Sequence, residues 1–480
     1  MIGLARIAAP IACLGFAVLL LARTRQNRLA GLGYAGVGAA LLVASLKPAG
    51  AGTVAVAVIG LLVLGGLLSL LFRREPWLVA FLTLACIPVQ VHYLHHQLLA
   101  PLYVVAAAAG FNLLRELVQG DERMREFGRA TKPLAFYLAW VGISVAWTGD
   151  IRNAALDIVG VYLPFAILAL AIARLPWDRL RLRLLYGELV IMALVFAGVG
   201  FYQYETRQLF ENPKQITGNA YAAFFRVNSV FYDPSIYGRF LVVALVPTAV
   251  LIVRGRSVRD AVLAVAFAVV AWVGLLISFS QSSFSALMVA VFCLCVFLWR
   301  WKSLALVVAA VVLLAGAAVA EPKIVHALRH HGVSELNKLA SGRGSLIYNG
   351  ILIAKAHPVE GVGIGGFSHA YAKRTHRTPR KSASHNTPVT VAAEEGGIGF
   401  LLYAWLVISL ALSAFRRIER SVRGDVALAA GLVLVAIFAH SLAYNDFFED
   451  PTTWGVIGLI GLVARQRVAA RGEPSAMIEP

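Results

Sequence analysis

Charged residues are scarce in this sequence. Asp, Glu, Lys and Arg make up only 14% of its 480 residues, whereas 59% of the residues are hydrophobic and the mean hydropathy is +0.76. Water-soluble domains need much more polar surface than this composition can supply. The shortage of charge therefore excludes an ordinary soluble protein and indicates that lipid surrounds most of the chain.

Cysteine is scarce as well. The four cysteines, Cys13, Cys86, Cys293 and Cys295, all lie in apolar runs. None is placed for a disulfide or a zinc site, so we interpret them as small apolar packing residues. The first apolar run also lacks a basic start and a small-residue cleavage site, which disfavours a cleaved signal peptide.

Long apolar runs, by contrast, recur from end to end. Runs of about 17 to 23 residues can cross a hydrocarbon core of roughly 30 Å as helices. Because backbone inside lipid must satisfy its own hydrogen bonds, the predicted fold class is all-α, a polytopic transmembrane helical bundle of about 12–15 spans with a long extracytoplasmic loop insert. The candidate runs are 4–22, 30–46, 53–72, 77–91, 98–114, 133–148, 154–173, 184–203, 236–253, 261–279, 284–299, 304–320, 398–415, 426–444 and 453–463.

The basic residues predict the orientation. The formal net charge is +18, but the basic residues sit in short clusters in every second loop and not along one polar face, so we expect no nucleic acid partner. Clusters such as Arg73-Arg74 and Arg416-Arg417 mark the cytoplasmic side by the positive-inside rule. The C-terminus is then cytoplasmic, and the protein is expected in a bacterial cytoplasmic membrane with its active site facing outward.

The spans and loops together predict six regions. They are N-terminal transmembrane helices at 1–203, a first extracytoplasmic loop at 204–235, central transmembrane helices at 236–320, a large extracytoplasmic loop at 321–397, C-terminal transmembrane helices at 398–464 and a cytoplasmic tail at 465–480.

The loop at 321–397 is basic although it is expected outside, and it contains the glycine-rich stretch Gly361 to Gly366. Long loops can translocate despite their charge, so the predicted topology stands. A basic outward loop favours a small insert that binds something anionic, or else attraction to acidic lipid headgroups. Arg343 opens a segment with helical spacing at 345–356, where a cation and a helix N-terminus suit a phosphate or diphosphate.

Several motifs now carry a resemblance. Three parts of the sequence resemble the O-antigen ligase and O-antigen polymerase (Wzy-type) superfamily. They are the stretch 226–238 (RVNSVFYDPSIYG), the start of a helix at Ser341-Gly342-Arg343 followed by His357-Pro358, and the pair His385-Asn386 followed by nine residues and Gly396. The similarity covers about 226–415. One departure is the segment 278–283 (SFSQSS), where relatives often carry a Ser-Arg pair.

This resemblance implies a membrane glycosyltransferase. Its expected partners are a polyprenyl-diphosphate-linked glycan donor, a glycan or lipid-linked hydroxyl acceptor, and membrane lipids. Many membrane glycosyltransferases hold a metal on acidic residues of the first outward loop, but that loop here is only Lys47-Pro48-Ala49-Gly50. We therefore expect metal-independent catalysis with no cofactor.

The resemblance and the chemistry together assign candidate residues. Arg226 and Arg343 would clamp the leaving diphosphate, since a guanidinium fork matches phosphate oxygens. His385 would accept or orient the acceptor proton. The candidate substrate-binding residues are Arg239, Asn386, Asp233 and Glu394. Arg239 is either a third phosphate contact or an ion-pair partner of Asp233 or Asp157.

Other interpretations stay open. A transporter or flippase of lipid-linked sugars is the rival class, although the sequence has no clear internal repeat. His92, His95 and His96 could bind a metal but lack a nearby carboxylate, which favours packing at the membrane interface. The acidic run 446–450 is expected to be an outward turn that could line an acceptor cleft. The sequence does not distinguish polymerisation from ligation to a lipid core or to a protein.

Overall fold

The computed structural model describes residues 2–467 apart from 47–50, 90, 94–95, 121–123, 211, 222–223, 256, 300–342, 377–382 and 417. The predicted span 304–320 and the first part of the predicted basic loop lie outside the described residues.

The first half of the chain forms nine of the helices. They are α1 (Ile2–Leu21), α2 (Arg25–Ser45), α3 (Ala51–Arg74), α4 (Leu78–Cys86), α5 (Ala100–Gln119), α6 (Thr131–Ser144), α7 (Ile151–Asp157), α8 (Leu163–Ala173) and α9 (Arg179–Thr206). A 3-10 turn, Gly128–Ala130, precedes α6, and a π-helical segment, Ile158–Tyr162, joins α7 to α8.

The second half continues the bundle. Its helices are α10 (Pro213–Tyr221), α11 (Pro234–Arg254), α12 (Val258–Ser278), α13 (Gln281–Trp299), α17 (Arg343–Ala356), α18 (Phe367–Thr375), α19 (Thr387–Phe415), α20 (Val422–Ser441) and α21 (Pro451–Ala464). The described strands are very short. β1 (Val91–Tyr93) pairs antiparallel with β2 (His96–Leu98), and β3 (Met124–Arg125) pairs antiparallel with β4 (Gln466–Arg467).

The predicted all-α membrane bundle is confirmed. Within the described residues, ten helices are long and apolar enough to cross a membrane, and α21 is a shorter apolar helix. The predicted run 77–91 is helical only over α4, because the chain then turns into the β1–β2 hairpin. The predicted span 398–415 begins earlier, at Thr387, and the helix continues through a kink at Gly396.

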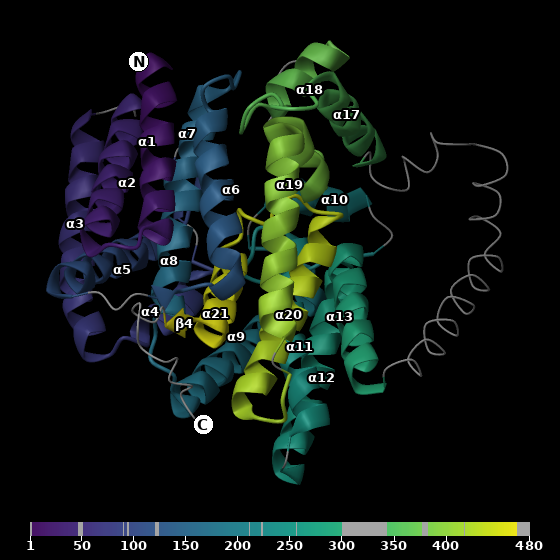
Figure 1. Ribbon diagram of the computed structural model, residues 1–480. Helices are drawn as coiled ribbons and strands as arrows, with labels where there is room; N and C mark the ends of the chain where they lie inside the picture. Colours follow the sequence, from purple (N-terminus) through teal and green to yellow (C-terminus); the bar gives the residue numbers. More distant parts are fainter. Residues whose placement is uncertain are drawn as a thin grey trace.

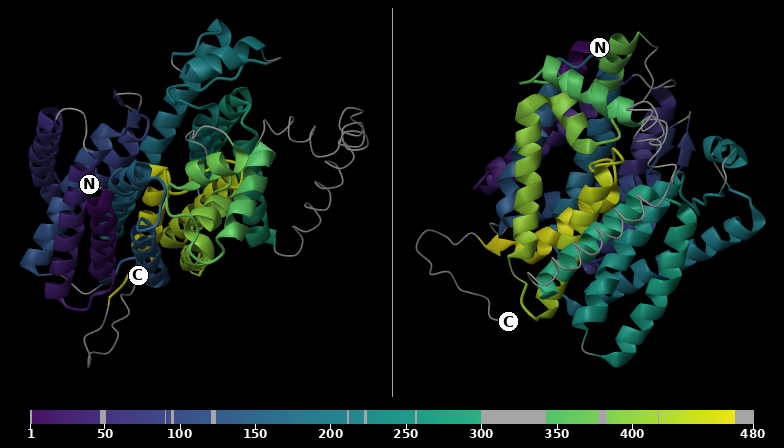
Figure 2. Two further views of the ribbon diagram at one scale, coloured as in Figure 1. Left: turned by 90° about the horizontal axis from the view of Figure 1, so that it is seen from above. Right: turned by 90° about the vertical axis from the view of Figure 1, so that its right-hand side faces the viewer.

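Close packing of small residues holds the helices together, as is typical in lipid. A Cβ at Gly38 of α2 would lie 2.4 Å from the backbone nitrogen of Ala12 in α1, so these two helices touch through their backbones. The N-terminal helices lie on one side of the bundle and α11 to α13 on the other (Figures 1 and 2). Helix α11 packs against α12, α13 and α20, and α21 packs against α8.

Helices α17 and α18 lie at one end of the bundle, which is also the end of the N-terminus, while the last described residues lie at the opposite end (Figure 1). We call this the α17–α18 end. Three helices begin toward it with a side-chain cap and a proline in the first turn: Asp233 caps α11, Asn386 caps α19 and Asp450 caps α21. Such starts satisfy the free backbone N–H groups of a first turn.

Candidate functional site

The connection between α20 and α21, residues 442–450, is the centre of the candidate site. Its first residues are held by side chains from distant segments. Asn386 Nδ2 donates to the carbonyl of Leu442 at 2.9 Å, and an Arg343 guanidinium nitrogen donates to the carbonyl of Ala443 at 3.2 Å. The 442–450 loop thereby gathers segments that are far apart in the sequence.

Arg226 approaches the same loop from the segment before α11. The side chain of Asn219 holds its backbone, accepting from the Arg226 N–H at 3.2 Å and donating to the Arg226 carbonyl at 2.9 Å. Arg226 Nε donates to the carbonyl of Ser278 at 3.3 Å. The Arg226 guanidinium is half-buried. Burial lowers its pKa, nearby Asp233 raises it, and nearby Arg343 lowers it again.

Arg226 and Arg343 thus lie within electrostatic reach of each other although they come from different parts of the chain. Within the described residues, neither has a carboxylate at ion-pair distance, and each guanidinium donates to a carbonyl oxygen. The two cations repel each other, and the Asp233 carboxylate offsets part of this repulsion without forming an ion pair with either arginine. The arrangement is favourable when an anion binds between them.

His385 lies in contact with the ring of Tyr444, a residue of the same 442–450 loop. The two ring centroids are 6.1 Å apart in an edge-to-face arrangement. His385 has a left-handed backbone with φ 57°, an uncommon conformation for a residue with a side chain. The buried Ser384 side chain fixes this turn, because its hydroxyl contacts both the backbone of Asn386 and the hydroxyl of Thr390.

Tyr444 is a site residue that the sequence did not single out. Burial raises the pKa of its phenol, as does nearby Asp233, while Arg239 and Arg343 lower it. Since the net shift is upward, the phenol stays protonated and can donate a hydrogen bond toward the space near the two arginines. Because Tyr444 ends the predicted apolar run 426–444, the sequence did not indicate that it belongs to the site.

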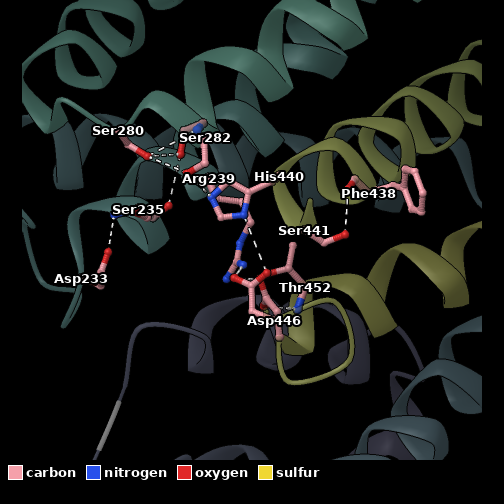
Figure 3. Close-up of polar contacts among 12 residues, drawn as sticks. Asp233, Ser235, Arg239, Ser280, Ser282, Phe438, His440, Ser441, Asp446 and Thr452 are labelled. Carbon is pink, nitrogen blue, oxygen red and sulfur yellow. Dashed lines mark hydrogen bonds and ion pairs between the residues drawn. The ribbon is translucent and has the colours of Figure 1, made fainter. Parts of the chain in front are cut away.

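Arg239 is buried, with 5% of its surface exposed, and is already paired. Its guanidinium forms an ion pair with Asp446 (Figure 3) and a second one, at 2.5 Å, with Asp450. The expected partners Asp233 and Asp157 are replaced by the two aspartates of the 442–450 loop, which folds back onto α11. Asp233 instead caps α11 by accepting from the N–H of Ser235 at 2.7 Å.

A second histidine, His440, joins these groups and was also missed. Its ring is fully buried, with Nε2 3.1 Å from Ser282 Oγ and Nδ1 3.7 Å from Asp446 Oδ1 (Figure 3). Ser282 belongs to the serine-rich segment 278–283. That segment, which departs from the family pattern, therefore packs directly against the site.

Glu394 and the glycine-rich stretch 361–366 brace α19. Glu394 Oε1 accepts from the N–H of Phe367 at the start of α18, and the Glu394 carbonyl accepts from Gly363 at 2.7 Å. A Cβ at Gly396 would lie 2.2 Å from the carbonyl of Val359, and Gly396 has φ 69°. Only glycine allows this approach, which fixes the first turns of α19 and with them His385 and Asn386.

Two cavities adjoin these residues. One, of about 50 Å³, is lined by the start of α19 and the 442–450 loop. The other, of about 190 Å³, is lined almost wholly by apolar side chains of α4, α8, α9, α11, α20 and α21. Pro451 and Thr452, which line the second cavity, follow directly after Asp450, the partner of Arg239.

Metal ligands do not gather in the part of the chain that the structure describes: it has no group of three or more His, Cys, Asp or Glu side chains that could hold a metal ion. His92 and His96 lie on the two strands of the β1–β2 hairpin, and His95 lies outside the described residues.

Comparison with protein families gives one match. Residues 266–404 match the family model described as O-antigen ligase, and a comparison with curated proteins gives no match. The matched range includes Arg343, His385, Asn386 and Glu394, whereas Arg226, Asp233 and Arg239 precede it. Over residues 266–404, the match agrees with the resemblance that the sequence motifs carry.

Proposed function

We propose that this chain, a multi-span membrane protein and glycosyltransferase-type enzyme of the O-antigen ligase family, transfers a glycan from a polyprenyl-diphosphate carrier to a hydroxyl acceptor. The observation that carries this proposal is the pair Arg226 and Arg343. Two arginines that have no carboxylate at ion-pair distance in the described part of the chain, placed around one loop with a protonated tyrosine, suit a diphosphate with several charged oxygens.

The reaction needs stabilisation of the leaving group. The bond between the anomeric carbon and the diphosphate oxygen breaks as the acceptor oxygen bonds to that carbon, and the diphosphate leaves with the electron pair. Arg226 and Arg343 would stabilise the charge that grows on it, without a metal ion. The acceptor hydroxyl would pass its proton to His385.

The apolar cavity of about 190 Å³ supports a lipid-linked donor. It lies next to Asp450, whose carboxylate pairs with Arg239, so an apolar space adjoins the charged residues of the site. A diphosphate held by the arginines would have room beside it for part of an apolar polyprenyl chain.

The proposal predicts transfer by the purified protein in proteoliposomes. The donor is the lipid-linked glycan extracted from producing cells, and the acceptor is the membrane glycolipid and glycan extract of the same cells. We expect new glycosidic linkages without added divalent metal and in the presence of a chelator. Movement of labelled donor across the vesicle membrane without any new linkage would favour a transporter or flippase instead.

We also propose that the α17–α18 end faces outward and that the opposite end is cytoplasmic. The helices that start at the site carry basic residues at their other ends, such as Arg254 in the last turn of α11 and Arg416 directly after α19. Positive residues at that end are typical of the cytoplasmic side.

This orientation predicts a labelling pattern in intact cells. A cysteine at Lys373 in α18 should react with a membrane-impermeant thiol reagent, whereas a cysteine at Glu419, between α19 and α20, should react only after permeabilisation. Both positions are exposed, so access depends on the side of the membrane. The unmodified chain measures the background from its four native cysteines. The reverse pattern would place the site on the cytoplasmic side.

A further inference from the structure

The cavity of about 50 Å³ differs in charge from the arginine pair. Its lining carries the carboxylates Asp157, Glu394, Glu395, Asp446 and Glu449 and includes no lysine or arginine. We infer that this cavity binds neutral hydroxyl groups of the acceptor. The inference rests on the proposed function and specifies the acceptor class for the same site.

Buried oxygen atoms without partners support a ligand. Thr387 Oγ1, Glu395 Oε2 and Asn445 Oδ1 are buried and have no hydrogen-bond partner within the described residues. All three residues line the cavity, and Thr387 and Glu395 are only 4% and 2% exposed. An unpaired buried polar atom is costly, and a hydroxyl group is a partner that can both donate and accept.

The position of the cavity connects it to the reaction. Thr387 follows His385 by two residues, and Asp446 lines the cavity while also facing Arg239 and His440. A hydroxyl-bearing group in the cavity would therefore lie close to the residue proposed to take the acceptor proton. The arginine pair would hold the donor and the carboxylate-lined cavity the acceptor.

Size and charge restrict the occupant. A cavity of about 50 Å³ exceeds the roughly 10–15 Å³ that is needed to hold one water molecule, so a group larger than water, such as a hydroxymethyl group, fits. The lining offers carboxyl groups and no lysine or arginine, so it provides no cation to hold a phosphate or a carboxylate. The acceptor is therefore expected to present a neutral, hydroxyl-rich end.

Binding can be tested without transfer. The probes are the neutral and the anionic glycan fractions of the producing membrane, separated by anion exchange, and the readout is the rise in melting temperature that each causes. The neutral fraction should stabilise the wild-type protein. In Thr387→Val its apparent affinity should fall about tenfold, the scale of one lost hydrogen bond. Donor binding should not change.

A matched control separates binding from folding. Because Thr387 Oγ1 has no hydrogen-bond partner among the described residues, Thr387→Val should not lower the melting temperature of the protein alone. Thr390 lines the same cavity but is hydrogen-bonded within the protein, so Thr390→Val should lower the melting temperature, because Thr390 Oγ1 lies 2.7 Å from Ser384 Oγ. The inference is overturned if only the anionic fraction binds, if neither binds, or if the neutral fraction stabilises both proteins equally. Binding without transfer would contradict the proposed function alone.

Discussion

Replacing either Arg226 or Arg343 with alanine is expected to reduce glycan transfer on the order of 10³-fold, the scale of losing one donor that stabilises transition-state charge. Neither change should lower the melting temperature. Within the described residues, each guanidinium donates to a carbonyl oxygen and has no carboxylate at ion-pair distance, so its removal breaks no ion pair there. The measurement is the initial transfer rate in proteoliposomes beside the melting temperature of each variant.

Lysine variants test the geometry of the same pair. Lysine keeps the charge but lacks the planar fork, so Arg226→Lys and Arg343→Lys should restore little of the lost rate. Arg374→Ala serves as the control, because this exposed arginine of α18 lies at the same end of the bundle. Near-normal transfer in both lysine variants would show that the two positions supply only diffuse positive charge.

Much of the fold could be predicted because lipid imposes simple rules. Apolar length located most of the helices, and the spans predicted to begin at 236 and 453 start only two residues earlier in the structure, after the caps Asp233 and Asp450. The start of α19 was placed too late. The segment Glu394 to Gly397 carries two carboxylates and two glycines, a composition typical of a loop. In the structure it is helix, because the glycine-rich stretch 361–366 packs against it and Gly396 absorbs a kink.

The candidate site could be predicted only in part. Arg226, Arg343 and His385 were chosen from motifs, and the structure brings all three to the 442–450 loop. The sequence of the 442–450 loop gave little indication that the loop forms the centre of the site. Its aspartates gain a role only when it folds back on Arg239, a contact between residues about 200 positions apart that local pattern does not encode. His440 and Tyr444 were hidden for the same reason, inside what reads as an apolar span.

Replacing His385 should separate the acceptor side from the donor side of the reaction. If His385 takes the acceptor proton, His385→Ala should reduce transfer by roughly 100-fold or more, the usual scale of general-base catalysis. Binding of a polyprenyl-diphosphate analogue should survive, because Arg226 and Arg343 remain in place. The His385→Asn variant keeps a residue that tolerates the left-handed backbone, so a loss shared by both variants reflects the imidazole and not strain.

The pH profile and a matched histidine complete the test of His385. An ordinary imidazole titrates near neutral pH and accepts a proton only in its neutral form. Wild-type transfer should therefore fall as pH decreases between about pH 9 and 5.5, and this dependence should disappear in His385→Ala. His376→Ala is the control, since His376 also has a left-handed backbone, with φ 54°, but ends α18 at an exposed position. If His385→Ala loses donor binding in parallel with the transfer rate, His385 helps to bind the diphosphate. If transfer by His385→Ala is unchanged across this pH range, His385 has no catalytic role.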